Sequence, residues 1–219
     1  MKRNTRLITG LSLLAAMSII LISIPFLRFS IIPAAPYLVY DAADIPIMIG
    51  AFLFGPIEGL LLTVIVSFIQ GFLFGGDAFY GTAMHIIATG TFVLVGGFIY
   101  KYRKTISGAL LALSIGALSS VVIMVGANLL ITPFYLHMPV EFVKGLIFPA
   151  IVPFNLIKFG INAAVCFILY KRLHKVFDYI INNSRNVINL RHKHKGKEES
   201  ANQADEVKLV NDTSSEEVK

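Results

Sequence analysis

Long apolar runs constrain the fold of this 219-residue chain more than any other feature. Six of them occupy most of the sequence between Leu7 and Leu169, and prolines, glycines or basic residues separate them. An α-helix needs about 20 apolar residues to cross the hydrocarbon core of a bilayer, where backbone groups must find their hydrogen-bond partners within the protein. The pattern therefore predicts an all-α membrane protein with six transmembrane helices.

The composition agrees with a lipid bilayer as the solvent. Hydrophobic residues make up 56% of the chain and charged residues 15%, against about 45–50% and about 25% in soluble domains. The net charge of +6 does not indicate nucleic acid as a partner, because the basic residues gather at the ends of the apolar runs. Cys166 is the single cysteine, which excludes an intrachain disulfide and a cysteine metal cluster.

The runs divide the chain into a membrane domain, residues 1–178, and a polar tail, residues 179–219. After about Asn182, residues Asn, Lys, Glu, Ser and Asp dominate and no aromatic residue follows, so we expect the tail to be largely disordered. The segment between the first two helices, residues 31–45, is expected to fold as a loop over a cavity. The helices are expected at 7–24, at a short segment ending near 54, and at 60–74, 79–100, 106–131 and 147–169, with a turn at 75–77 and a second substantial loop at 133–141.

Basic clusters predict the orientation in the membrane. They fall on one side of the expected bundle, whereas Arg28 and Lys144 are the only lysine or arginine residues in the loops on the opposite side. The positive-inside rule places the basic side, with both termini, in the cytoplasm. The clusters are Lys2, Arg3 and Arg6; Lys101, Arg103 and Lys104; and Lys171, Arg172 and Lys175.

Two polar residues interrupt the last apolar run. Asn155 and Lys158 are three positions apart, so on a helix they share one face. A lysine inside an apolar span costs about 2.5–3.5 kcal/mol on insertion scales, so its side chain should face a cavity or a partner. These residues either line a site for a small ligand with polar groups, or the lysine is structural and snorkels or pairs with a buried acid.

Other polar residues are expected at the same outer half of the bundle. His85 lies near the start of the fourth helix and Asn128 in the last turns of the fifth. Asp41 and Asp44 precede Pro46, which suits the start of a helix. The gathering of polar groups beneath the outer loops is the arrangement that captures a solute from outside.

Motifs for self-sufficient chemistry are missing from the sequence. It contains no Walker A motif, no HExxH or GxSxG motif and no paired carboxylates inside the expected spans. We therefore expect a binding protein that is not an enzyme, holds no cofactor or metal of its own and depends on a partner for energy.

Three segments carry a resemblance to a known family: YDAADIP (residues 40–46), FGP (54–56) and PFNLIK (153–158). With them, residues 7–175 resemble the substrate-binding (S) components of bacterial energy-coupling factor (ECF) transporters, and most closely their riboflavin-specific branch. The resemblance implies a six-helix S-component bundle in the cell membrane, with riboflavin bound near the outer face under the first loop. It also implies a transmembrane coupling subunit and two ATP-hydrolysing subunits as partners, with Ser12 and Ala16 of the first helix contacting the coupling subunit.

The expected ligand contacts combine the resemblance with position. Riboflavin has a flat ring with carbonyl acceptors and an N–H on one edge, and a polyhydroxylated ribityl chain, so it needs apolar walls and a few polar groups. The residues in the matched segments are Tyr40, Asp41, Asn155 and Lys158, and position adds Leu38 and Asn128, with His85 as a further candidate.

Two alternatives stay open. The ligand could be FMN or another vitamin, and Arg28 near the first loop could then meet a phosphate. The chain could instead be an integral membrane enzyme or a self-sufficient carrier, for which His85, Lys158 and Gln70 are the candidate residues inside the bundle.

Overall fold

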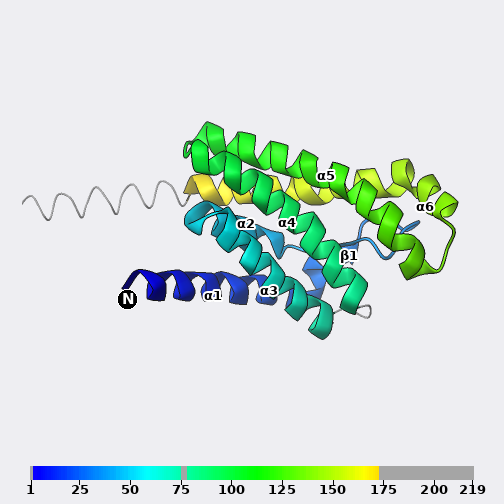
Figure 1. The fold of residues 1–219 in the computed structure, drawn as a ribbon, viewed down its shortest axis with the longest axis horizontal. Coiled ribbons are helices and arrows are strands. Elements are labelled where there is room, and N and C mark those ends of the chain that lie inside the picture. The colour runs from blue at the N-terminus through cyan, green and yellow to red at the C-terminus, as the bar shows by residue number, and fades with distance from the viewer. Residues whose placement is uncertain (1, 75–77, 173–219) are drawn as a thin grey trace, which may run out of the picture. The chain divides into compact units, whose positions relative to one another are not determined.

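The structure is a computed structural model that describes residues 2–74 and 78–172 (Figure 1). Contacts divide the chain into two units, Met1–Lys171 and Arg172–Lys219, and the second lies almost entirely outside the described residues. The expected turn at 75–77, the domain boundary at 178 and the polar tail also lie outside them.

Helices make up nearly all of the described chain, which confirms the expected all-α class. The first helix and the second are joined by a short 3-10 turn and a two-stranded ribbon. The elements are α1 (Lys2–Ser23), η1 (Pro25–Leu27), β1 (Phe29–Ser30), β2 (Val39–Tyr40), α2 (Asp44–Phe54), α3 (Pro56–Phe74), α4 (Ala78–Tyr102), α5 (Ile106–Leu136), α6 (Val140–Leu146) and the π-helical turn η2 (Ile147–Ile151), which continues as a helix over 152–172.

Four helices are long and apolar enough to cross a membrane, and two are shorter. The four are Pro56–Leu73, Phe79–Tyr102, Ile106–Leu136 and Val140–Arg172, and the shorter apolar helices are Leu7–Ser23 and Asp44–Phe54. At 1.5 Å per residue, the 11 residues of α2 extend about 16 Å, roughly half of a hydrocarbon core of about 30 Å. Helix α2 therefore cannot cross the bilayer alone.

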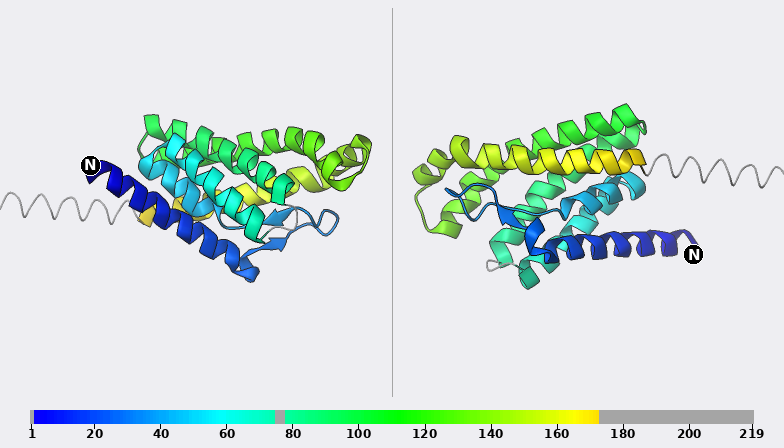
Figure 2. Two further views of the ribbon diagram at one scale, coloured as in Figure 1. Left: turned by 60° about the horizontal axis from the view of Figure 1, so that its bottom comes forward. Right: turned by 180° about the vertical axis from the view of Figure 1, so that it is seen from behind.

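The chain before α2 is folded but not helical. Strands β1 and β2 pair antiparallel, with Phe29 opposite Tyr40, and the ribbon lies at the same end of the bundle as α6 (Figures 1 and 2). Leu38 and Tyr40 are buried in an apolar cluster that includes Ile151 and Phe154 of the last helix. Irregular backbone is tolerated at membrane depth where protein buries it or where it lines a cavity. The segment before α2 is therefore a folded loop, as the sequence predicts.

The expected loop at 133–141 is wrong in its extent. Helix α5 runs through Pro133 to Leu136, and the next helix begins at Val140 rather than near 147. Pro133 lies in the last turns, so its missing N–H removes only one backbone bond, and neighbouring groups can compensate in a membrane protein. His137 ends the helix in the left-handed conformation with φ 53°, and its N–H donates to the Pro133 carbonyl.

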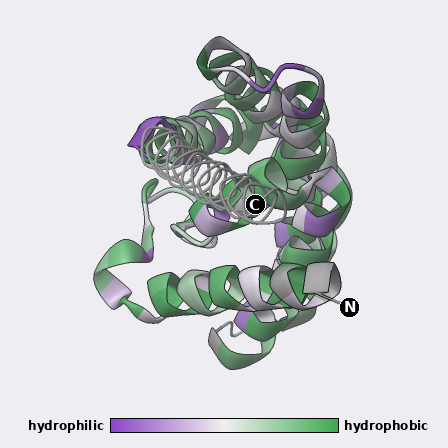
Figure 3. Cartoon of the chain, turned by 90° about the vertical axis from the view of Figure 1, so that its left-hand side faces the viewer, coloured by the Kyte–Doolittle hydropathy of each residue, from purple (hydrophilic) through white to green (hydrophobic). Residues whose placement is uncertain are grey.

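A close approach of α4 and α5 forms the centre of the bundle. A Cβ atom on Gly96 would lie 2.4 Å from Met48 Cε and 3.1 Å from the Ala112 carbonyl oxygen. Around this contact, Phe92 and Phe159 are fully buried. Hydrophobic residues predominate along the helices (Figure 3), and many large apolar side chains are exposed, as expected where a membrane protein faces lipid.

Replacing Gly96 by valine should destabilise the fold by about 1–3 kcal/mol, because the added atoms meet the α5 backbone. Gly126→Val is the matched control, since a Cβ there meets nothing within 4 Å. Thermal unfolding of the purified proteins in detergent measures both effects. Equal stability of the two variants would contradict the close approach.

Candidate functional site

A cavity of about 330 Å³ opens at the end of the bundle that carries the β-ribbon. Its walls come from the segment between α1 and α2, the last turns of α3, the first turns of α4, the last turns of α5 and residues 154–158. The volume falls in the range of small-molecule pockets. Polar lining residues include Arg28, Tyr37, Asp41, Ser67, Gln70, Tyr80, His85, Thr132, Tyr135, Asn155 and Lys158, and apolar ones include Leu38, Val39, Met84, Ala88, Met124, Ile131 and Phe154.

The structure brings five of the seven sequence-predicted ligand residues to this cavity. Leu38 and Asp41 come from the first loop, and His85 from α4. Asn155 and Lys158 come from the last helix, on one face as their spacing predicts. Tyr40 and Asn128 are buried but do not line the cavity.

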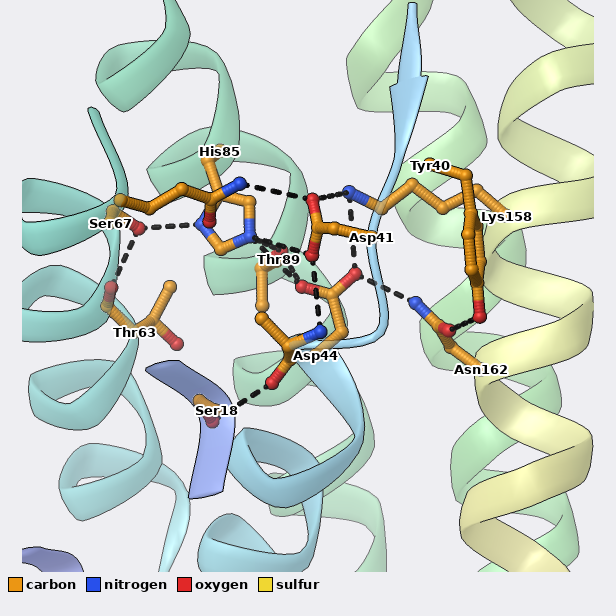
Figure 4. Close-up of polar contacts among 12 residues, drawn as sticks. Ser18, Tyr40, Asp41, Asp44, Thr63, Ser67, His85, Thr89, Lys158 and Asn162 are labelled. Carbon is orange, nitrogen blue, oxygen red and sulfur yellow. Dashed lines mark hydrogen bonds and ion pairs between the residues drawn. The ribbon is translucent and has the colours of Figure 1, made fainter. Parts of the chain in front are cut away.

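Lys158 forms ion pairs with two buried carboxylates. Its Nζ lies 3.6 Å from Asp41 Oδ2 and 3.4 Å from Asp44 Oδ2, and all three side chains are at most 7% exposed. Figure 4 shows the two aspartates between His85 on one side and Lys158 on the other. The alternative in which the lysine pairs with a buried acid is therefore correct, and Lys158 also lines the cavity.

Asp44 starts α2, and three further side chains besides Lys158 surround its carboxylate. Thr89 Oγ1 donates to Oδ1 at 2.6 Å and Asn162 Nδ2 donates to Oδ2 at 2.9 Å. His85 Nε2 lies 3.1 Å from Oδ1. A buried charge is tolerated when it is paired and hydrogen-bonded in this way. Asp44 therefore does more than start its helix.

Tyr40 supports the Asp44 carboxylate indirectly, through Asn162. Its hydroxyl donates to Asn162 Oδ1 at 2.9 Å, and Asn162 in turn holds Asp44. Burial raises the pKa of the Tyr40 phenol, and the carboxylates of Asp44 and Asp41 raise it further, so the hydroxyl keeps the proton that it donates. Tyr40 acts on the cavity through the position of Asp44.

His85 joins α3 and α4 to the carboxylates. Nε2 faces Asp44 and lies 3.9 Å from Asp41 Oδ1, while Nδ1 lies 2.6 Å from the Ser67 hydroxyl. Because carboxylates only accept hydrogen bonds, Nε2 carries a proton. His85 is thus a satisfied buried histidine that also forms part of the cavity wall.

Both predicted asparagines use their amide groups within their own helices. Asn155 Nδ2 donates to the Ile151 carbonyl at 2.8 Å, and Asn128 Nδ2 donates to the Met124 carbonyl at 2.8 Å. Asn128 Oδ1 accepts from Thr132 at 3.0 Å, and Thr132 lines the cavity. A buried amide needs hydrogen-bond partners, and Asn128 has them within α5, next to the lining residue Thr132 but not itself in the cavity lining.

Asp41, Asp44 and His85 also have the side-chain types that bind metal ions, with ligand atoms within 4.8 Å of one another. The Lys158 ammonium, however, lies within 3.6 Å of both carboxylates. A divalent ion there would meet a fixed positive charge at close range. We therefore interpret the cluster as a charge-paired network.

Sequence reasoning missed several members of this network. Asn162 lies four residues after Lys158 in the same apolar run, so it shares the face that Asn155 and Lys158 define, and this spacing could have identified it. Thr89 and Ser67 carried no comparable signal, because hydroxyl residues are ordinary in membrane helices.

Comparison with known proteins adds an independent finding. A family model described as "ECF transporter, substrate-specific component" matches residues 6–170. The chain is 29% identical over 179 residues to the riboflavin transporter RibU of Staphylococcus aureus (strain TCH60), covering 79% of this chain and 92% of that protein. It is 30% identical over 164 residues to the riboflavin transporter FmnP of Bacillus subtilis (strain 168), covering 70% and 83%.

A solved structure has the same fold. It is described as "Structure and mechanism of the S component of a bacterial ECF transporter", and it superposes with a TM-score of 0.69 at 26% sequence identity. The match covers 80% of this chain and 98% of that chain. The expected S-component-like bundle is confirmed.

Replacing Lys158 by methionine should destabilise the protein by about 3–5 kcal/mol, because two buried carboxylates lose their cation. Lys144→Met is the matched control, since its pair with Glu141 at 3.7 Å is exposed and its loss should cost less than about 1 kcal/mol. Unfolding in detergent without ligand measures both. A Lys158 variant as stable as the control would contradict the buried ion pairs.

Proposed function

Because this chain belongs to the family of substrate-specific components of ECF transporters, we propose that it is the riboflavin-binding membrane subunit of a vitamin uptake transporter. One observation carries the proposal: the cavity of about 330 Å³ is lined by Asp41, Asn155 and Lys158, which lie in the segments that carry the resemblance to the riboflavin-specific branch. Two relatives named as riboflavin transporters support the choice of ligand.

The lining suits the two parts of riboflavin. Tyr37, Tyr80 and Tyr135 come from three different elements and lie ring against ring, with centroids 6.2 Å and 5.6 Å apart for the two successive pairs. Together with apolar side chains such as Leu38 and Phe154, they provide walls for a flat ring. Lys158 and Asn155 supply polar groups for the ring edge or the ribityl hydroxyls.

The orientation follows the positive-inside rule. It puts both termini in the cytoplasm of a bacterial cell and the cavity toward the outside, so that the protein takes up riboflavin from the medium. Energy would come from ATP hydrolysed by two partner subunits, through a transmembrane coupling subunit. The protein itself would hold no cofactor, and its relatives are named as transporters.

Helix α1 offers a surface for the coupling subunit. Ser12 and Ala16 are exposed and four residues apart, while Leu14 and Ser18 of the same helix face the bundle and are buried. Small residues at this spacing let a second membrane helix approach closely. The exposed stripe fits the partner contact that the family resemblance implies.

FMN is a second candidate ligand. Arg28, in the segment between α1 and α2, lines the cavity, and a guanidinium is a good partner for a phosphate. Competition between riboflavin and FMN for the purified protein distinguishes the two.

Protein purified from cells grown with riboflavin should carry a yellow flavin, visible in its absorbance spectrum. Asn155→Ala should weaken riboflavin binding at least about tenfold, or about 1.4 kcal/mol, because a polar lining group is lost. Quenching of riboflavin fluorescence measures the affinity, with Phe148→Ala on the 83%-exposed position of the same helical segment as control. Colourless protein that does not quench added riboflavin would overturn the proposed function.

Ala16→Trp should spare riboflavin binding but reduce riboflavin uptake about tenfold or more, since a large side chain blocks close approach of the partner. The same result is expected for Ser12→Trp. Leu118→Trp, at a position of α5 where the residue is 59% exposed, is the control that should leave uptake unchanged. Uptake of labelled riboflavin by cells that express the whole transporter measures the effect, and normal uptake by both α1 variants would refute the interface.

A further inference from the structure

Two buried polar atoms at the cavity have no hydrogen-bond partner among the described residues: Gln70 Oε1 and Tyr37 Oη. Both side chains line the cavity, from the end of α3 and from the first loop. Leaving a buried polar atom unsatisfied costs about 1–3 kcal/mol, and native structures rarely do so without a reason. A ligand in the cavity would supply the missing partners.

The orientation of the Gln70 amide is determined by its neighbour. Gln70 Nε2 donates to Asp41 Oδ2 at 3.2 Å. A carboxylate accepts hydrogen bonds and has none to give, so the amide cannot present its oxygen to Asp41. Asp41 is itself held by the Ala43 N–H at 3.2 Å and by the Lys158 ammonium at 3.6 Å. Gln70 Oε1 is therefore a fixed acceptor.

Gln70 and Lys158 approach the same oxygen of Asp41. Their nitrogen atoms lie 3.2 Å and 3.6 Å from Oδ2, so the two side chains are neighbours around one carboxylate oxygen. The ammonium has three N–H groups and can only donate, whereas the free amide oxygen can only accept. Together they present a donor beside an acceptor to the cavity. Their complement is a ligand with an acceptor beside a donor.

We propose that Gln70 determines ligand specificity by accepting a hydrogen bond from a donor group of the flavin, while Lys158 donates to the neighbouring ligand oxygen. This inference rests on the proposed function. Two parts of riboflavin have the required chemistry: the ring imide, whose N–H stands between two carbonyls, and the ribityl chain, whose adjacent hydroxyls both donate and accept. Tyr37 adds a hydroxyl that can satisfy either kind of group and so discriminates less.

The test combines one variant with three ligands. Gln70→Leu removes the acceptor with little change in size, and its affinity is compared with that of the unaltered protein by fluorescence quenching. The ligands are riboflavin, 3-methylriboflavin, which lacks the imide N–H, and lumiflavin, which lacks the ribityl hydroxyls. Riboflavin binding should weaken about tenfold in the variant, or about 1.4 kcal/mol. For the analogue that lacks the paired donor, variant and unaltered protein should bind within about twofold, which identifies the donor.

Other outcomes overturn the proposal. An equal loss for all three ligands means that Gln70 acts only by holding Asp41, and an unchanged riboflavin affinity means that it does not contact the ligand. Should Gln70→Leu fail to fold, Gln70→Met serves in its place, and the unaltered protein must still bind one of the analogues more weakly than riboflavin. Failure of the unaltered protein to bind riboflavin at all would instead overturn the proposed function.

Discussion

The ion pairs of Lys158 with Asp41 and Asp44 are the interaction on which the rest of the structure depends. They join the last helix to the non-helical segment before α2 and to the first turn of α2 itself. Burying any one of these charges alone would be costly, so the three are stable inside the bundle only together. Through His85 and Gln70, the same carboxylates also contact α3 and α4.

The ion pairs explain how a helix of 11 residues can belong to a membrane bundle. Between α1 and α2, the chain forms irregular structure, and its backbone polar groups need hydrogen-bond partners that lipid cannot provide. Asp41 accepts the Ala43 N–H, and Ser18 of α1 donates to the Ala43 carbonyl at 3.1 Å. Because α2 is short, the segment before it can fold within the bundle. This segment forms one wall of the cavity. A buried ion pair is weak evidence for stability, but here the pairs fix the position of the segment before α2 against the last helix.

Much of the fold could be predicted because lipid allows few solutions. The apolar runs predicted the helices, and a lysine in an apolar span predicted an interior partner or cavity. The prediction failed where a local signal competed with tertiary packing. Pro133 predicted a loop, yet it lies inside α5, because a proline in the last turns of a membrane helix costs little. Asn128 stays a prediction as a ligand contact: its amide bonds to the Met124 carbonyl and to Thr132, which itself lines the cavity.

The sequence by itself determined that the chain crosses a membrane, which face Asn155 and Lys158 share, and which family its segments resemble. These depend on hydrophobicity, on helical periodicity and on local motifs, all of which are properties of neighbouring residues. Only the tertiary structure decided that Lys158, besides lining the cavity, pairs with Asp41 and Asp44. Those residues are more than 100 positions apart in the chain, and only packing of the helices brings their charges within 4 Å of one another.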